Sequence, residues 1–137
     1  MAIYETLSTK AGSMSGRLLI SAMALLRRNF AKLEPKVVTS AAADYIPTLA
    51  DAGQTVLRTN AGAQTVTLPQ NSAVAFPIGA YVDFAVIGAG ACTFQAGAGA
   101  TVDKRALDTL AALTKSVVRA RKVSTNGWLV SGGLTLA

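Results

Sequence analysis

A regular alternation of apolar and polar residues in the middle of the chain predicts a β-strand. Within residues 80–87, the apolar positions Val82, Phe84 and Val86 share one face. The opposite face consists of Tyr81, Asp83 and Ala85. A period of two is typical of a strand that buries one face. Proline or glycine on both sides supplies turns, so we expect this strand to organise the residues around it.

Other short apolar segments lie between turn residues and predict further strands. They cover 55–59, 64–68, 92–95, 117–123 and 128–131, with 101–102 as a weaker candidate. Asn126-Gly127 predicts a tight hairpin between the last two long segments. Residues 103–112 are expected to form a polar loop or a single helical turn. About seven or eight short strands at regular intervals favour a mainly β protein. We expect residues 37–137 to form a single jelly-roll-like antiparallel β-sandwich.

Before this domain, residues 17–34 follow the period of a helix. One continuous apolar stripe is formed by Leu19, Met23, Leu26, Phe30 and Leu33. Ser15 can cap this helix, and Pro35 is expected to end it. Residues 1–16 are polar and read as an extended arm with two apolar anchors, Ile3 and Tyr4. Residues 1–36 are therefore predicted to be an attachment segment, whose helix packs on its own β domain or docks on a partner subunit.

Composition and charge add to the interpretation of this segment. The chain has 137 residues and a net charge of +6, of which +4 lies within residues 1–36. This indicates an acidic partner for the N-terminal segment or a solvated basic helix face, and both interpretations stay open. Only 15% of the residues are charged, which suggests a surface partly covered by other subunits.

The residues needed for common reaction chemistry are missing. The chain contains no histidine, which excludes Ser-His-Asp catalytic triads and the usual zinc sites. Its single cysteine, Cys92, cannot form a disulfide within the chain and is expected to be a small buried hydrophobe. Gly88-Ala89-Gly90 and Gly97-Ala98-Gly99 lack the third glycine of a dinucleotide-binding fingerprint and are interpreted as hairpin turns. We expect no enzyme activity, no catalytic residue, no cofactor and no metal.

The longest apolar run, residues 18–26, is too short for a membrane span. It has nine residues between arginines, whereas a bilayer crossing needs roughly 20. No small-residue cleavage site follows it. We expect neither export nor a membrane partner.

A second group of basic residues lies in the predicted β domain. Arg119, Arg121 and Lys122 form a basic patch, which Arg58 could join from another strand. Binding of nucleic acid would need aromatic side chains between these charges, and the sequence does not place them there. The patch is predicted to contact carboxylates on a neighbouring protein subunit, without direct binding of nucleic acid.

Four segments resemble a β domain found in virion proteins of tailed bacteriophages. They are Leu49-Ala50-Asp51-Ala52-Gly53, Ala63-Gln64-Thr65-Val66-Thr67-Leu68-Pro69, Phe76-Pro77-Ile78-Gly79 and Asn126-Gly127-Trp128-Leu129-Val130-Ser131-Gly132. The resemblance covers about residues 45–133, and among these proteins the chain looks most like capsid decoration (cement) proteins. It implies a jelly-roll-like body, no enzymatic activity, and self-association on a capsid.

On this resemblance, the chain is expected to bind the outside of a bacteriophage capsid and to cement neighbouring major capsid protein subunits. It would assemble as a homodimer or homotrimer on the capsid exterior, after synthesis in the host bacterial cytoplasm. The residues expected to contact the capsid are Ile3, Tyr4, Arg17, Leu19, Met23, Leu26, Arg27, Arg28 and Phe30. The alternatives are a head- or tail-fibre or baseplate module that binds a host-surface glycan, and a secreted adhesin.

Overall fold

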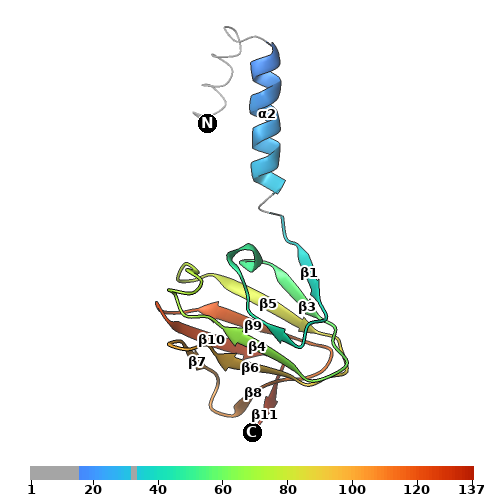
Figure 1. Ribbon diagram of the computed structural model, residues 1–137, viewed down its shortest axis with the longest axis vertical. Helices are drawn as coiled ribbons and strands as arrows, with labels where there is room; N and C mark the ends of the chain where they lie inside the picture. The colour runs from blue at the N-terminus through green and yellow to red at the C-terminus, as the bar shows by residue number, and fades with distance from the viewer. Residues whose placement is uncertain (1–15, 32–33) are drawn as a thin grey trace. The chain divides into compact units, whose positions relative to one another are not determined.

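Two compact units make up the chain, Met1–Glu34 and Pro35–Ala137. The computed structural model describes residues 16–31 and 34–137 (Figure 1). In the first unit this includes one helix, α2 (Gly16–Ala31), which begins one residue before the predicted range of 17–34. Residues 1–15 of the predicted arm, with the capping residue Ser15, lie outside the described residues, as does Leu33. We call the second unit the β body.

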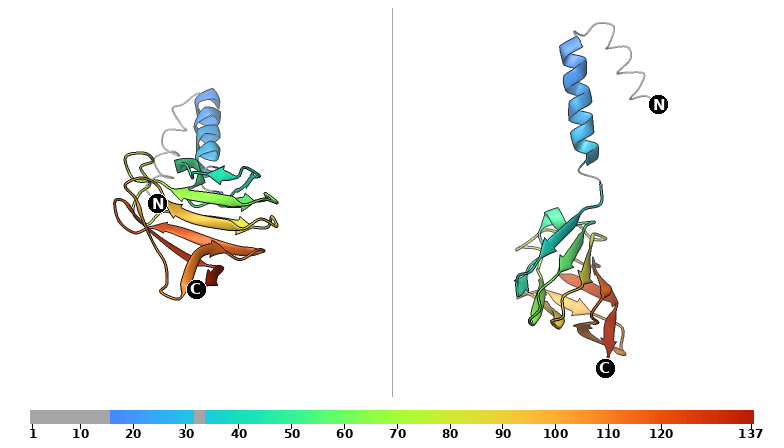
Figure 2. Two further views of the ribbon diagram at one scale, coloured as in Figure 1. Left: turned by 60° about the horizontal axis from the view of Figure 1, so that its bottom comes forward. Right: turned by 90° about the vertical axis from the view of Figure 1, so that its right-hand side faces the viewer.

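The β body consists of eleven strands and one short 3₁₀ helix. The elements in chain order are β1 (Val37–Ser40), β2 (Asp44–Tyr45), η1 (Leu49–Asp51), β3 (Thr55–Arg58), β4 (Gln64–Leu68), β5 (Tyr81–Val86), β6 (Cys92–Ala96), β7 (Thr101–Asp103), β8 (Asp108–Ala112), β9 (Ser116–Lys122), β10 (Gly127–Gly132) and β11 (Leu134–Leu136). They form a six-stranded sheet, β1-β3-β5-β9-β10-β7, and a five-stranded sheet, β11-β8-β6-β4-β2. The two sheets lie as two layers (Figure 2). The expectation of a mainly β fold is confirmed.

The first six strands wind around a common axis, because consecutive strands alternate between the two sheets. We call this superhelical arrangement of β1 to β6 the coil. In one sheet β1 pairs with β3 and β3 with β5, and in the other β2 pairs with β4 and β4 with β6. All four pairings are parallel, because each turn of the coil brings the chain back in the same direction. The prediction of an entirely antiparallel sandwich is therefore wrong for this half, and the jelly-roll topology is not confirmed.

The later strands are mostly antiparallel and extend both sheets beyond the coil. Strand β9 pairs with β5 and forms a hairpin with β10, while β8 pairs with β6 and β11 with β8. The hairpin before Trp128 is confirmed, although neither Asn126 nor Gly127 has a positive φ, so its turn is not the tight type expected for Asn-Gly. The polar loop predicted over 103–112 contains strand β8. Asp108 occupies an inward position of β8 and is buried beneath Arg105, which donates a hydrogen bond to it at 2.7 Å. Because a charged residue stands where an apolar one is expected, the alternation of this strand is not visible in the sequence.

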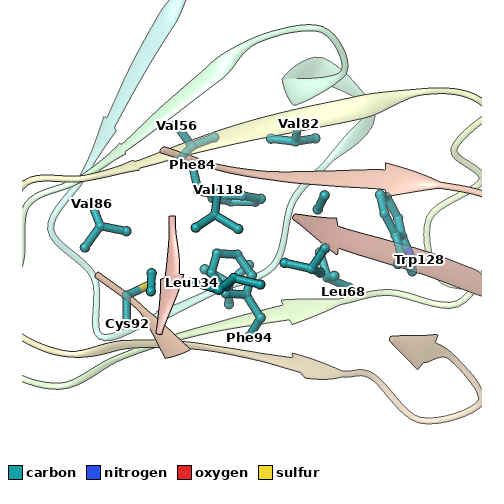
Figure 3. Packing of buried hydrophobic residues seen from close by; sticks show 14 of the residues in the cluster. Val56, Leu68, Val82, Phe84, Val86, Cys92, Phe94, Val118, Trp128 and Leu134 are labelled. Carbon is teal, nitrogen blue, oxygen red and sulfur yellow. The ribbon is translucent and has the colours of Figure 1, made fainter. Parts of the chain in front are cut away.

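The core lies between the two sheets and entirely within the β body (Figure 3). The inward positions Val82, Phe84 and Val86 are buried, as the alternation predicts, and so is Cys92. Phe84 of one sheet packs edge-on against Phe94 of the other, with ring centroids 5.4 Å apart. The described core includes no residue of α2, so we expect the β body to fold without the first unit.

The turns that connect the two sheets stack on one another at one end of the coil. Residues 87–91 link β5 to β6 and lie on residues 59–63, which link β3 to β4. Gly88 donates its N–H to the carbonyl of Arg58 at 3.0 Å, and Gly90 donates to Asn60 at 3.3 Å. The segment 88–90 was interpreted as a hairpin turn, but it crosses between sheets. The segment 97–99, which links β6 to β7, does the same.

Candidate functional site

Helix α2 exposes an apolar stripe, which we call the α2 stripe and define as Leu19, Met23, Leu26 and Phe30. Three of the four side chains are exposed, Phe30 by 63%, and Leu26 is half-buried. Because the residues are four, three and four positions apart, they fall within about 60° of one another around the helix axis. Covering such apolar surface is favourable by roughly 25 cal/mol per Å². The α2 stripe is therefore suited to contact another protein surface.

Arg27 lies beside this stripe, about 40° from Met23 around the helix axis, whereas Arg28 lies on the opposite face of the helix. Arg27 and Arg28 are both exposed, and Arg28 lies in the last turn of α2, where a positive charge complements the helix dipole. Five of the residues expected to contact a capsid therefore lie on one side of the helix: Leu19, Met23, Leu26, Arg27 and Phe30. Arg28 does not lie with them. Arg17 belongs to the same helix, but its side chain lies outside the described residues, as do Ile3 and Tyr4.

The basic patch predicted in the β body does not form as a surface. Arg58 is 0% exposed and Lys122 is 1% exposed. The reason is the alternation of each strand: Lys122 shares the inward face of β9 with Val118 and Ala120, and Arg58 is on the inward face of β3. Burial also lowers the pKa of the Lys122 ammonium group. Only Arg119 and Arg121 therefore remain on the outer face.

On that outer face, two arginines surround a tyrosine and a carboxylate. The guanidinium of Arg119 donates to both carboxylate oxygens of Asp83, each at 2.7 Å, across the β5–β9 pairing. Its central carbon lies 4.0 Å from the ring centroid of Tyr81, and that of Arg121 lies 5.7 Å from the same ring. The sequence predicted that Tyr81 and Asp83 share one face of a strand, and the structure places Arg119 and Arg121 on the same face of the sheet.

This arrangement limits what the outer face can bind. The hydrogen bond to Asp83 raises the pKa of Arg119, and the two opposite charges neutralise each other locally. A sugar ring binds an aromatic side chain by stacking on its face, but Arg119 already covers a face of Tyr81. The remaining Arg121 offers one positive charge for a carboxylate on a neighbouring subunit, a weaker contact than the four-residue basic patch that was expected.

A second polar cluster lies inside the β body around Arg58. Its guanidinium donates to the hydroxyl of Ser40 at 2.8 Å and to the carbonyls of Ala42 at 2.7 Å and Ala43 at 3.3 Å. It also lies 5.2 Å from the ring centroid of Tyr45. These contacts hold the turn between β1 and β2 against β3. Arg58 is therefore a structural residue of the first turn of the coil and not a contact for another subunit.

Tyr45 connects this cluster to η1. Its hydroxyl donates to the carboxylate of Asp51 at 3.0 Å, and the same carboxylate accepts the backbone N–H of Thr48 at 2.7 Å. Burial, together with the hydrogen bond and charge of Asp51, raises the pKa of Tyr45 to about 12. The phenol is thus held in its protonated form.

We expect this phenol to make the β body less stable at alkaline pH. An ordinary tyrosine has a pKa of 10.0, so between pH 10 and about 12 the folded state keeps a proton that the unfolded state has lost. The stability that depends on this proton is fully present below pH 10 and is lost as the pH rises towards 12. Urea unfolding across this range should show the loss, and Tyr45→Phe should flatten it. The control Tyr81→Phe, on the outer face, should keep the loss, and an equally steep curve for Tyr45→Phe would contradict the assignment.

The remaining features of the described residues do not indicate what the chain binds or acts on. Among residues 16–31 and 34–137, no three His, Cys, Asp or Glu side chains gather in a way that could hold a metal ion. Within the same residues, no helix has the length and apolar character needed to cross a membrane. Comparison of the chain with models of protein families, with curated proteins and with solved structures finds no match.

Proposed function

We propose that this chain is a structural virion protein that binds the outside of a bacteriophage capsid and cements neighbouring major capsid protein subunits. The proposal includes self-association, a location on the capsid exterior and no catalytic role. The proposal requires that the β body is a two-layered sandwich. It does not require the jelly-roll topology that the resemblance implies.

The observation that carries the proposal is the α2 stripe. The free energy is lowered when another apolar surface covers the exposed side chains of Leu19, Met23 and Phe30. Arg27 beside them can contact a carboxylate of the same partner. An amphipathic helix that lies in a groove of a partner is a common mode of recognition. A capsid surface is built from many copies of one protein, so it would present any such groove repeatedly.

The β body supports the proposal by having its own core. Its buried residues extend from Val56 to Leu134, so it can remain folded while the first unit binds elsewhere. A domain with its own hydrophobic core can fold by itself, which leaves the first unit available for attachment. The resemblance of residues 45–133 to virion β domains points the same way.

Deletion of residues 1–34 is the direct test. We expect the remaining chain, Pro35–Ala137, to stay folded, because the described core lies within it. We expect it to lose binding to capsids assembled from the major capsid protein, because the α2 stripe is gone. Circular dichroism checks the fold, and co-sedimentation with capsids measures binding. A truncated chain that still decorates capsids fully would show that the anchor lies in the β body.

Single substitutions on α2 place the contact on one face. Phe30→Glu adds a charge to the α2 stripe and should reduce the amount bound to capsids at least ~tenfold, because a buried charge without a partner is costly. Leu25→Glu is the matched control, because Leu25 is also exposed but lies away from the stripe. Equal losses for both variants would contradict the stripe as the contact.

Binding of the purified protein to a glycan array, without binding to capsids, would favour the fibre module instead.

A further inference from the structure

Strand β1 leaves one edge of the six-stranded sheet unpaired within the described residues. It lies at the end of the strand order and pairs only with β3. Val37 is 66% exposed and Val38 is 36% exposed, although the side chain of Val38 is on the same face as buried Val56. The inward valine is exposed because no further strand covers it. The coil is thus open at its first turn.

The direction of the backbone groups of β1 follows from its pairing with β3. The carbonyls of Lys36 and Ser40 accept N–H groups from Thr55 and Thr59, at 3.0 Å and 3.1 Å. Because backbone groups alternate along a strand, Val38 also faces β3, whereas the N–H and C=O groups of Val37 and Thr39 face the open edge. Two donors and two acceptors are therefore presented in a row of three residues.

This row is complementary to itself. When two copies of β1 run antiparallel about a two-fold axis at Val38, Val37 of each copy lies opposite Thr39 of the other. Each such pair can exchange two N–H···O=C hydrogen bonds, which makes four in total. The two Val38 side chains then face each other at the closely spaced position between these pairs, and each covers the exposed part of the other.

We propose that the free edge of β1 joins two copies of this chain through antiparallel β1–β1 pairing. The two six-stranded sheets then form one continuous sheet across the two-fold axis. This inference rests on the proposed function only in that it supplies its self-association, and the pairing can be measured without any capsid. A failure of capsid binding and a failure of pairing are therefore distinguishable.

The sequence of β1 favours a second copy as the occupant of this edge. Natural edge strands avoid pairing by carrying charges, prolines or bulges. Residues 37–40 have none of these, whereas β7 at the other edge of the same sheet includes Asp103. An isologous contact also needs the same patch on both partners, and the symmetry of the row around Val38 provides it.

The oligomeric state of the β body, Pro35–Ala137, tests the proposal in the absence of α2. The contact is small compared with the ~1,200 Å² of a stable interface, so we expect a reversible equilibrium between monomer and dimer. Sedimentation velocity from roughly 5 to 500 µM should show the mass rise from one chain to two. At the high concentrations, the amide hydrogens of Val37 and Thr39 should exchange more slowly with solvent.

Thr39→Pro separates pairing from folding. It removes two of the four hydrogen bonds and leaves the β1–β3 pairing intact, because the N–H of Thr39 faces the open edge. We expect the dissociation constant of the dimer to rise at least ~tenfold. Thr39→Ala keeps the N–H and should dimerise like the wild type.

Val38→Lys provides a second variant, because it places two like charges opposite each other at the axis and should also leave a monomer. A β body that stays monomeric over the whole concentration range would overturn the proposal. A trimer, or a dimer unaffected by both Thr39→Pro and Val38→Lys, would overturn it as well.

Discussion

Gly90→Ala is expected to lower the free energy of unfolding by ~3 kcal/mol, because the turn that contains Gly90 has no room for a methyl group. A Cβ atom at this position would lie 1.6 Å from the carbonyl oxygen of Gly62 in the turn below. That oxygen belongs to the backbone, so relief requires the two stacked turns to separate. Separation would break the hydrogen bond from Gly90 to Asn60 as well. Thermal unfolding should show a decrease in Tm of roughly 10–20 °C.

Gly62→Ala is the matched control, since it makes the same chemical change in the other of the two turns. A Cβ atom at Gly62 would lie 3.4 Å from the side-chain oxygen of Asn60, an ordinary contact. We expect this variant to unfold within about 5 °C of the wild type. If Gly90→Ala and Gly62→Ala have the same Tm, the turns do not stack as closely as the structure shows.

The strands that were predicted well are those whose alternation is uninterrupted. The stretch 80–87 contains β5, and its inward residues Val82, Phe84 and Val86 are all buried. The strand within 117–123 was also found, although Lys122 was expected to lie with Arg119 and Arg121 and is buried instead. A period of two depends only on neighbouring residues, so one sequence is sufficient to reveal it.

Strand pairing could not be predicted in the same way. Val37 pairs with Thr55, and Thr55 pairs with Asp83, so equivalent positions in successive turns of the coil lie 18 and 28 residues apart. Because these distances differ, the turns leave no repeat of fixed length in the sequence. Short strands separated by turns are common to antiparallel sandwiches and to this coil. The resemblance to jelly-roll-like virion domains favoured the antiparallel arrangement.

The basic residues were misassigned because a charge is normally a sign of exposure. Lys122 follows Arg121, and the alternation within β9 requires the two to lie on opposite faces. For Arg58 the sequence is less informative, since Val56 and Leu57 are both apolar and either could have been the inward residue. The helix, in contrast, could be predicted with its apolar stripe, because the stripe needs no knowledge of the pairing.

Arg58→Ala is expected to destabilise the β body by ~3–5 kcal/mol, an effect as large as the loss of a large core residue. A buried guanidinium is costly to desolvate, and its hydrogen bonds to Ser40, Ala42 and Ala43 offset part of that cost, whereas its buried Nε has no hydrogen-bond partner within the described residues. Alanine leaves these acceptors without a donor and opens a cavity between the sheets. The loss should be greatest in the first turn of the coil, because Arg58 holds the turn between β1 and β2 against β3.

Hydrogen exchange distinguishes this local role from a general loss of stability. In Arg58→Ala, the amide hydrogens that β1 and β2 contribute to the sheets should exchange faster than those of β5 and β9. Arg121→Ala is the matched control: it removes an exposed arginine from the outer face of β9, so it should cost less than ~1 kcal/mol. An Arg58→Ala variant as stable as Arg121→Ala would show that the first turn is held by its strand pairing alone. The open edge of β1 depends on the same arginine, so loosening this turn should also weaken β1–β1 pairing.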